Sequence, residues 1–274
     1  RGITVDEAGE TNFDYDDGSY QLNERYVAWL WKLGSTGSSS TWNSSYTAPS
    51  TEHYNASAGV TTIEVSPASS GNLEVAHSLS AAPEFFWVAD DQGYANFSGY
   101  PAFHKDLDSG KYLQLDSNSG QSSDSTYFPS GAAHADYIKL GSAFTDDYGY
   151  GFNLRIWAFT GVEGYSKFGS FVGNGSSDGT MVYTGFRPAL VMVKSMGTQR
   201  WAMIDSVRGP INPNRNTVYA EDSTTEYSGT LHDRDFLSNG FKLRNTDGIF
   251  NTNDQKYLYC AWAEQPFSAP SNAR

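Results

Sequence analysis

The sequence predicts an all-β protein made of two tandem β-sandwich or jelly-roll repeats of about 100 residues each, preceded by an N-terminal strand segment. Three observations lead to this fold class. Among the 274 residues, aromatic side chains make up 15% and charged side chains only 18%, with 27 glycines, which is typical of strands joined by polar turns. No stretch shows the i, i+3, i+4, i+7 apolar spacing of an amphipathic helix. Finally, the chain repeats itself.

The repetition consists of short apolar runs that recur at a nearly constant separation. The matching runs are Pro83–Val88 with Pro188–Val193, Ile138–Leu140 with Phe241–Leu243, and Leu154–Phe159 with Tyr257–Trp262. Their separations lie between 103 and 105 residues. A constant period over most of the chain indicates two copies of one unit. Such repetition favours a protein that presents a surface over one that builds a single catalytic cleft.

Four segments follow from this period. Residues 1–32 form the N-terminal strand segment, which is the end of an upstream repeat or a strand that pairs with another subunit. Residues 33–59 are rich in Ser, Thr and Gly and lack strand alternation, which predicts a linker or long surface loop. Repeat 1 occupies 60–160 and repeat 2 occupies 161–274. Because only a few residues join the two repeats, we expect them to pack against one another.

Within each repeat, short runs of strand-forming residues are bounded by Gly, Ser, Asn and Asp. The expected strands of repeat 1 cover 63–65, 84–89, 111–115, 137–140 and 153–159. Those of repeat 2 cover 168–172, 181–183, 189–194, 201–204, 241–244 and 257–263. Most strand aromatics are expected in the core, namely Phe85, Phe86, Trp87, Trp157, Phe159 and Trp262.

Charge and cysteine content exclude several classes of partner. The net charge of −13 argues against nucleic acid and against an anionic membrane surface, since both require clustered Lys and Arg. A neutral or cationic glycan remains compatible. Cys260 stands alone inside an apolar run, which predicts a buried thiol and no disulfide. No apolar run approaches the ~18 residues of a membrane span. The chain begins at Arg1, so we expect processing or truncation upstream.

The run Tyr26–Trp31 is apolar on both faces of a strand, with Tyr26 on one face and Val27, Trp29 and Trp31 on the other. A bare strand of this kind is an aggregation hazard. We therefore expect it to pair with the sheet of a neighbouring subunit, or alternatively to close the first sandwich of its own chain.

Two acidic loops are candidates for calcium. Asp14 and Asp16 belong to a D-x-D-D-G run, and Asp106 and Asp108 to a D-x-D-x-G run. Alternating carboxylates around a glycine turn supply the oxygen ligands that Ca²⁺ prefers. Neither loop has the closing Glu of a complete EF-type site, and Asp and Gly are also ordinary turn residues. No other cofactor is expected.

Three aromatic residues, Trp42, Tyr46 and Tyr54, lie in the Ser-rich stretch, where a core role is hard to assign. An exposed aromatic ring can stack on a sugar or anchor a protein interface. The alternative is that these rings fold back onto the sandwich as a loop plug.

Motifs for catalysis are lacking. The five histidines are dispersed, and there is no G-x-S-x-G, H-E-x-x-H, P-loop or G-x-G-x-x-G pattern. A pair of glycosidase carboxylates stays open as an alternative, since such acids need only be about 5 to 10 Å apart in the fold. The sequence therefore predicts a protein that is not an enzyme.

One stretch resembles a known repeat family. The runs Val162–Gly179 and Tyr183–Lys194, continued by Trp201–Ser206, Asp235–Leu243 and Tyr257–Phe267, are similar to a repeat of virion structural and tail-fibre-like proteins of marine and other environmental bacteriophages. The resemblance covers the second copy well and the first weakly. It implies a concanavalin-like or jelly-roll sandwich in a virion or surface appendage, and no catalytic residues.

These observations together predict a non-enzymatic structural subunit of a phage virion (tail fibre or decoration) or extracellular appendage. It would self-associate as a homo-oligomer or fibre and display surface loops. The alternative is a carbohydrate-binding module for host surface glycans, and a more distant one is a glycan depolymerase. Each places the protein in a virion or outside the cell, without nucleic acid or membrane insertion.

Overall fold

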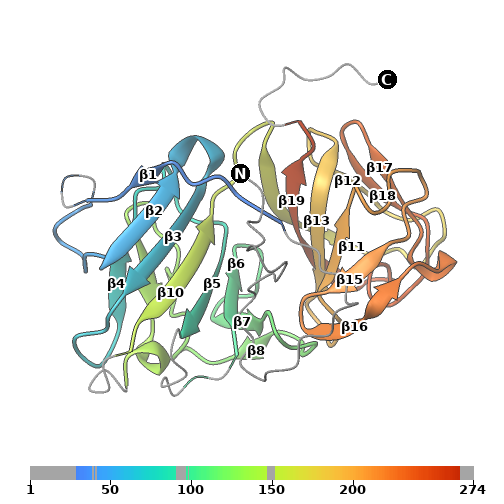
Figure 1. Cartoon of the computed structure of the whole chain (residues 1–274). Helices are drawn as coiled ribbons and strands as arrows, with labels where there is room; N and C mark the ends of the chain where they lie inside the picture. Colours follow the sequence, from blue (N-terminus) through green and yellow to red (C-terminus); the bar gives the residue numbers. More distant parts are fainter. Residues whose placement is uncertain are drawn as a thin grey trace, which may run out of the picture. The chain divides into compact units, whose positions relative to one another are not determined.

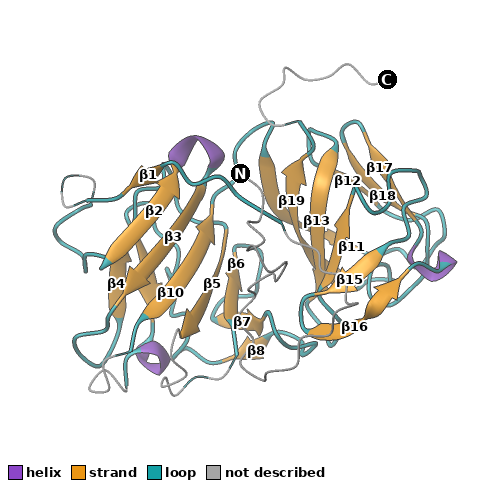
Figure 2. Cartoon of the chain, viewed as in Figure 1, coloured by secondary structure: helices purple, strands orange, loops and turns teal. Residues whose placement is uncertain are grey.

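The computed structural model describes residues 29–38, 40, 42–90, 97, 99–146 and 152–265 (Figures 1 and 2). The chain divides into two compact units, Arg1–Trp31 and Lys32–Arg274. All described strands belong to the second unit, and the described helical elements are short 3-10 turns. The all-β prediction is therefore confirmed. No described helix has the length and apolar character needed to cross a membrane.

The described residues of repeat 1 and of the stretch before it form ten strands. These are β1 (Ser35–Thr36), β2 (Thr51–Asn55), β3 (Val60–Val65), β4 (Leu73–Ala76), β5 (Phe85–Asp90), β6 (Pro101–His104), β7 (Lys111–Gln114), β8 (Ser122–Ser123), β9 (Tyr137–Leu140) and β10 (Leu154–Phe159), with 3-10 turns η1 (Ala56–Ala58) and η2 (Ser142–Phe144). One large sheet has the order β1-β2-β3-β10-β5-β6-β7-β8, and β4 pairs with β9 in a small sheet. Both sheets contribute to one buried core, for example through Ile156 of β10 and Ile138 of β9.

Nine strands lie in the part of repeat 2 that the structure describes. These are β11 (Ser166–Val172), β12 (Met181–Tyr183), β13 (Pro188–Ser195), β14 (Ala202–Asp205), β15 (Thr217–Tyr219), β16 (Asp222–Tyr227), β17 (Arg234–Leu237), β18 (Gly240–Leu243) and β19 (Lys256–Ala263), with the 3-10 turn η4 (Thr230–His232). The large sheet has the order β11-β19-β13-β14-β15-β16, and the small sheet the order β12-β18-β17. A second buried core lies between them, including Tyr259 and Phe241.

The two repeats share one strand order. Strands β3-β10-β5-β6-β7-β8 of repeat 1 correspond one by one to β11-β19-β13-β14-β15-β16 of repeat 2, and β4-β9 corresponds to β12-β18. The register agrees as well, since Trp87 lies opposite Trp157 just as Met192 lies opposite Cys260. Both pairs follow from the sequence period, so the internal repetition corresponds to a repeated topology.

The stretch 33–59 differs from the expected linker or loop. It contains β1 and β2, and all five residues of β2 pair with β3, which extends the large sheet. The physical reason is that the inward side chain of β2 is Glu52, a buried carboxylate. A strand whose buried residue is polar shows no apolar alternation in the sequence.

Two of the aromatic residues expected in the core, Trp87 and Trp157, are only half-buried. In β10, Leu154, Ile156 and Ala158 face the core of repeat 1, whereas the alternate residue Trp157 lies on the other face of the sheet. Its ring stacks on that of Trp87, with centroids 5.5 Å apart and an interplanar angle of 11°. The core prediction is thus wrong for this pair, because strand alternation sends it to the outer face.

Further along that outer face, residues of repeat 1 contact repeat 2. The Phe85 ring lies 6.2 Å from Phe168 and 6.3 Å from Trp201, and Phe159 meets Trp262 edge-on at 5.5 Å. Polar contacts flank these rings: Trp201 Nε1 donates to Gln114 O at 2.8 Å, and Lys256 Nζ donates to Asp106 O at 2.9 Å. These buried aromatics join the repeats within the unit Lys32–Arg274.

Candidate functional site

Trp42 is held by a buried carboxylate. Its indole Nε1 donates to Glu52 Oε2 at 2.6 Å. Glu52 also accepts hydrogen bonds from Thr61 Oγ1 at 2.8 Å, Ser78 N at 2.8 Å and Ser78 Oγ at 2.6 Å. Gly37 leaves the space for this contact, because a Cβ there would clash with Glu52 Oε2 and with the indole of Trp42. The geometry favours the loop plug for Trp42 over a free ring that stacks on a ligand.

Tyr46 belongs to an aromatic cluster on the small sheet of repeat 1. Its ring centroid lies 4.4 Å from that of Tyr137 on β9, and His134 stacks on Tyr137 at 4.4 Å with an interplanar angle of 14°. His134 and its neighbour Asp136 are exposed, while the two tyrosines are half-buried. We call Tyr46, Tyr137 and His134 the aromatic stack. Rings of this kind at the surface can bind the apolar face of a sugar.

The remaining predicted residues do not join this cluster. Tyr54 lies in β2, paired with Thr61 and Ser35, and is half-buried. Tyr26 and Val27 fall outside the described residues, whereas Trp29 and Trp31 are described and half-buried. Pairing of this run with another subunit thus stays a prediction.

The second acidic loop forms a turn. Lys111 N donates to Asp108 O at 3.0 Å, and Gly110 has a φ of 70°. The Asp108 carboxylate accepts from Gln121 Nε2 at 2.5 Å. Within the described part of the chain, no group of three or more His, Cys, Asp or Glu side chains could hold a metal ion. The described geometry of Asp106 and Asp108 favours the turn interpretation, and Asp14 and Asp16 lie outside the described residues.

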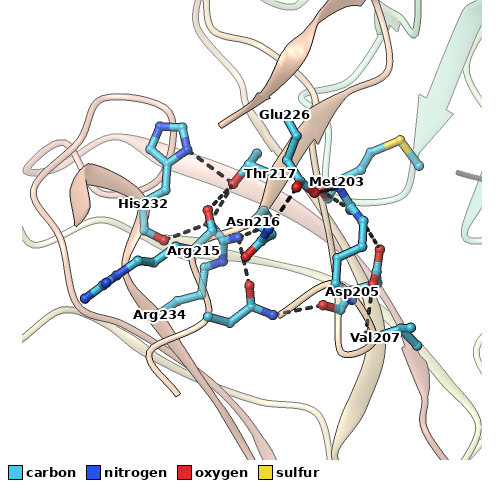
Figure 3. A network of polar contacts seen from close by, with 11 residues as sticks. Met203, Asp205, Val207, Arg215, Asn216, Thr217, Glu226, His232 and Arg234 are labelled. Carbon is cyan, nitrogen blue, oxygen red and sulfur yellow. Dashed lines mark hydrogen bonds and ion pairs between the residues drawn. The ribbon is translucent and has the colours of Figure 1, made fainter. Parts of the chain in front are cut away.

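A polar network centred on Arg234 lies in repeat 2 (Figure 3), and no sequence pattern predicts it. The guanidinium is buried and donates to Thr217 Oγ1 at 2.8 Å, His232 O at 2.7 Å, Asn216 O at 2.6 Å and Asn214 Oδ1 at 3.3 Å. Burial lowers the pKa of Arg234 to about 9, so the group is still charged at neutral pH. Its Nε has no hydrogen-bond partner among the described atoms.

The same network fixes the loop after β14 (Figure 3). Asp205 Oδ1 accepts from Val207 N at 3.0 Å and Arg208 N at 2.8 Å, and its Oδ2 accepts from Arg208 Nε at 2.5 Å. Asn214 Nδ2 then donates to Asp205 O at 2.9 Å. Asn214 is also bound to Arg234 of β17, because Asn214 N donates to Arg234 O at 2.7 Å, so the loop is tied to β17. The side chain of Val207 projects into solvent. The network therefore acts as a loop scaffold.

A buried lysine is the strongest candidate for proton chemistry. Lys194 Nζ donates to Ser195 O at 2.9 Å and Gly197 O at 3.0 Å, and burial lowers its pKa to about 8. Burial also raises the pKa of Glu221, whose charge acts on Lys194. Shifted pairs of this kind are typical of acid–base sites. However, Lys194 is fully buried and its ammonium is bound by two carbonyls, so a substrate cannot reach it without local opening.

Neither network was predicted from the sequence. Lys194 ends an apolar run, and Arg234 lies among charged residues that resemble a surface turn. The position of Lys194 directly after an apolar run in the same strand is the one sequence signal that indicates a buried cation.

One family model, described as a domain of unknown function (DUF7483), matches residues 2–266. It covers both repeats and nearly all of the N-terminal segment as a single domain, and its description carries no link to bacteriophages. Comparisons with curated proteins and with solved structures give no match. The chain belongs to the DUF7483 domain family.

Proposed function

We propose that this chain is a non-enzymatic structural subunit of a virion, as tail fibre or decoration, or of an extracellular appendage. The observation that carries the proposal is the duplicated topology. Two sandwiches with one strand order are joined through buried aromatic rings into one compact unit. A subunit of this kind is suited to bearing load and displaying loops.

The hydrogen bonding of the buried polar side chains supports a structural role. Three buried polar side chains form hydrogen bonds with the backbone or with neighbouring side chains, namely Glu52, Lys194 and Arg234. Buried polar networks that are nearly saturated rigidify a fold. In repeat 2 this rigidity reaches a displayed loop, where Val207 and Ile211 are 84% and 78% exposed.

The virion or appendage location rests on the resemblance of residues 162–194 to phage structural repeats. Quantitative mass spectrometry of gradient-purified particles, cell surfaces and soluble fractions from the source culture tests it. We expect the chain to copurify with particles or a surface appendage at a fixed stoichiometry. Recovery only in the soluble intracellular fraction would overturn the proposal.

A second candidate function is binding of host surface glycans, and the aromatic stack favours it. A single sugar site with a Kd of ~1 mM corresponds to only about 4 kcal/mol. Many copies in one assembly would raise the avidity by about 10²-fold or more. Asp136, exposed next to the stack, could accept hydrogen bonds from sugar hydroxyls.

A glycan array tests this second function. The Tyr46→Ala and His134→Ala variants should lose any glycan signal of the unaltered chain, while Tyr100→Ala, an exposed tyrosine elsewhere on repeat 1, should keep it. Equal loss in all three variants, or no signal at all, would argue against a glycan site at the stack. Incubation of the same polysaccharides with the chain tests the depolymerase alternative, for which we expect no release of shorter saccharides.

A further inference from the structure

In repeat 1, both edge strands on one side of the sandwich are covered by the chain itself. β2 pairs with β3 over five residues. Thr47 pairs with β4, since Thr47 N donates to Glu74 O at 2.7 Å and Ala76 N donates to Thr47 O at 2.9 Å. The stretch 47–55 thus caps the large sheet and the small sheet together.

The corresponding edges of repeat 2 have no such cover among the described residues. β11 and β12, the counterparts of β3 and β4, each stand at the end of their sheet. At one end of β11, Ser166 pairs with Val162, and at the other end the Val172 carbonyl accepts from Thr180 Oγ1 at 2.8 Å. The central part of the edge lies between these two contacts.

The repeated register shows which backbone groups face outward there. In β3, the Glu64 carbonyl accepts from Ser50 N on the β2 side. The pairing of β11 with β19 places Ser170 at the position that Glu64 holds against β10, and Phe168 at that of Thr62. Because backbone direction alternates along a strand, Phe168 and Ser170 direct their N–H and C=O groups to the open side.

Exposed apolar side chains gather at the same edges. Val172 is 52% exposed, Met181 38% and Tyr183 59%. By register, Glu74 and Ala76 of β4 in repeat 1 correspond to Met181 and Tyr183 of β12 in repeat 2. Glu74 is ion-paired with Lys139, and Ala76 is buried. Repeat 2 therefore carries apolar residues where repeat 1 has an ion pair and a cover.

The usual protections of an edge strand are also weak here. Neither β11 nor β12 contains proline. The one lysine of β11, Lys167, is held on its own chain, with Nζ 2.9 Å from Tyr183 O and 5.1 Å from the centre of the Tyr183 ring. Natural proteins usually block such edges with prolines, free charges or bulges.

We propose that the β11–β12 edge of one chain pairs with the same edge of a second copy about a twofold axis. Antiparallel pairing centred on Gly169 sets Phe168 opposite Ser170 of the other copy, and each such pair exchanges two backbone hydrogen bonds. Val172, Met181 and Tyr183 surround the seam and lose their exposure. The inference rests on the proposed role as a self-associating subunit and supplies its contact.

The test uses the full chain in sedimentation equilibrium at concentrations up to about 100 μM. We expect a dimer, twice the chain mass of 30.1 kDa. The variant Val172→Lys/Met181→Lys/Tyr183→Lys alters only exposed side chains and should raise the dimer Kd by at least about 10-fold. The matched control is Val207→Lys/Ile211→Lys, which places charge on even more exposed apolar residues and should leave the dimer unchanged.

Hydrogen exchange provides a second readout. The amides of Phe168 and Ser170 should become protected as concentration rises through the Kd. A monomer at the highest concentration, an open-ended oligomer, or equal effects of the edge and control variants would each overturn the inference. If the chain associates with particles but stays monomeric, the proposed dimer contact is wrong and the proposed function stands. If the chain dimerises but is found only in the soluble intracellular fraction, the proposed function is wrong and the dimer contact stands.

Discussion

Replacing Glu52 by glutamine tests the buried carboxylate that joins Trp42 to the sheet. Each oxygen of Glu52 accepts two hydrogen bonds, from Thr61 Oγ1 and Ser78 N on Oε1 and from Trp42 Nε1 and Ser78 Oγ on Oε2. An amide keeps one oxygen, and its NH₂ group faces one N–H donor and one hydroxyl. The bond from that N–H is lost, the hydroxyl has to turn and accept from the NH₂ group, and the bonds that remain no longer have a charged acceptor. Hydrogen bonds to charged groups contribute about 1.5–3 kcal/mol each, of which hydration of the freed donors returns a part. We expect a net loss of about 3 kcal/mol.

For a unit of this size, such a loss lowers Tm by about 6–12 °C, which differential scanning calorimetry measures directly. The control is Glu64→Gln on β3, a half-buried carboxylate outside this cluster, which should change Tm by less than about 2 °C. A double-mutant cycle with Trp42→Phe isolates the indole–carboxylate bond, for which we expect a coupling of about 1 kcal/mol or more. Equal Tm values for Glu52→Gln and Glu64→Gln, or no coupling, would refute the plug.

Three further predictions concern the repeat interface, pH and calcium. Phe85→Ala, which removes a fully buried ring between the repeats, should cost about 3–5 kcal/mol and split one calorimetric transition into two; a single unshifted transition would contradict this. Burial lowers the pKa of His104 to about 4, below the unfolded value of 6.5, so its stability contribution is complete above pH 6.5 and is lost as pH falls towards 4. Denaturant titrations should therefore show about 2 kcal/mol less stability at pH 5 from this group, and His104→Gln should flatten the slope. Asp108→Asn should alter stability by less than about 0.5 kcal/mol with or without millimolar calcium, whereas a calcium-dependent rise in Tm that this variant abolishes would support a metal loop.

The strand positions of the repeats could be predicted from local sequence because their cores are apolar. The expected strand 84–89 became β5, and the period of 103 to 105 residues carried over to the pairing of Trp87 with Trp157 and of Met192 with Cys260. Periodicity gives the spacing of buried residues, but it does not say which of the two faces of a sheet meets which partner. That is why Trp157 was expected in the core and lies on the outer face.

Structural features that depend on buried polar residues could not be predicted from the sequence. β2 has the sequence Thr-Glu-His-Tyr-Asn, and its inward residue is Glu52, so no apolar pattern marks it as a strand. Tyr46 was a candidate, but its partners His134 and Tyr137 lie about 90 residues away and only the fold brings them close. The burial of Arg234 could not be predicted either, because only the fold brings its hydrogen-bond acceptors close. Two of these acceptors come from the loop before β15.

The position of the last strand in each repeat affects how the chain is made. β10 lies between β3 and β5, although it follows both in the sequence, and β19 likewise lies between β11 and β13. On the ribosome, β3 and β5 therefore emerge with no central partner, and their facing edges stay unpaired until Leu154–Phe159 appears. Nascent repeats with late central strands fold slowly and expose edges to neighbouring chains. Chains translated close together on one message would meet while these strand edges are still unpaired. The order of synthesis therefore favours exchange of the central strand between copies as a misfolding route.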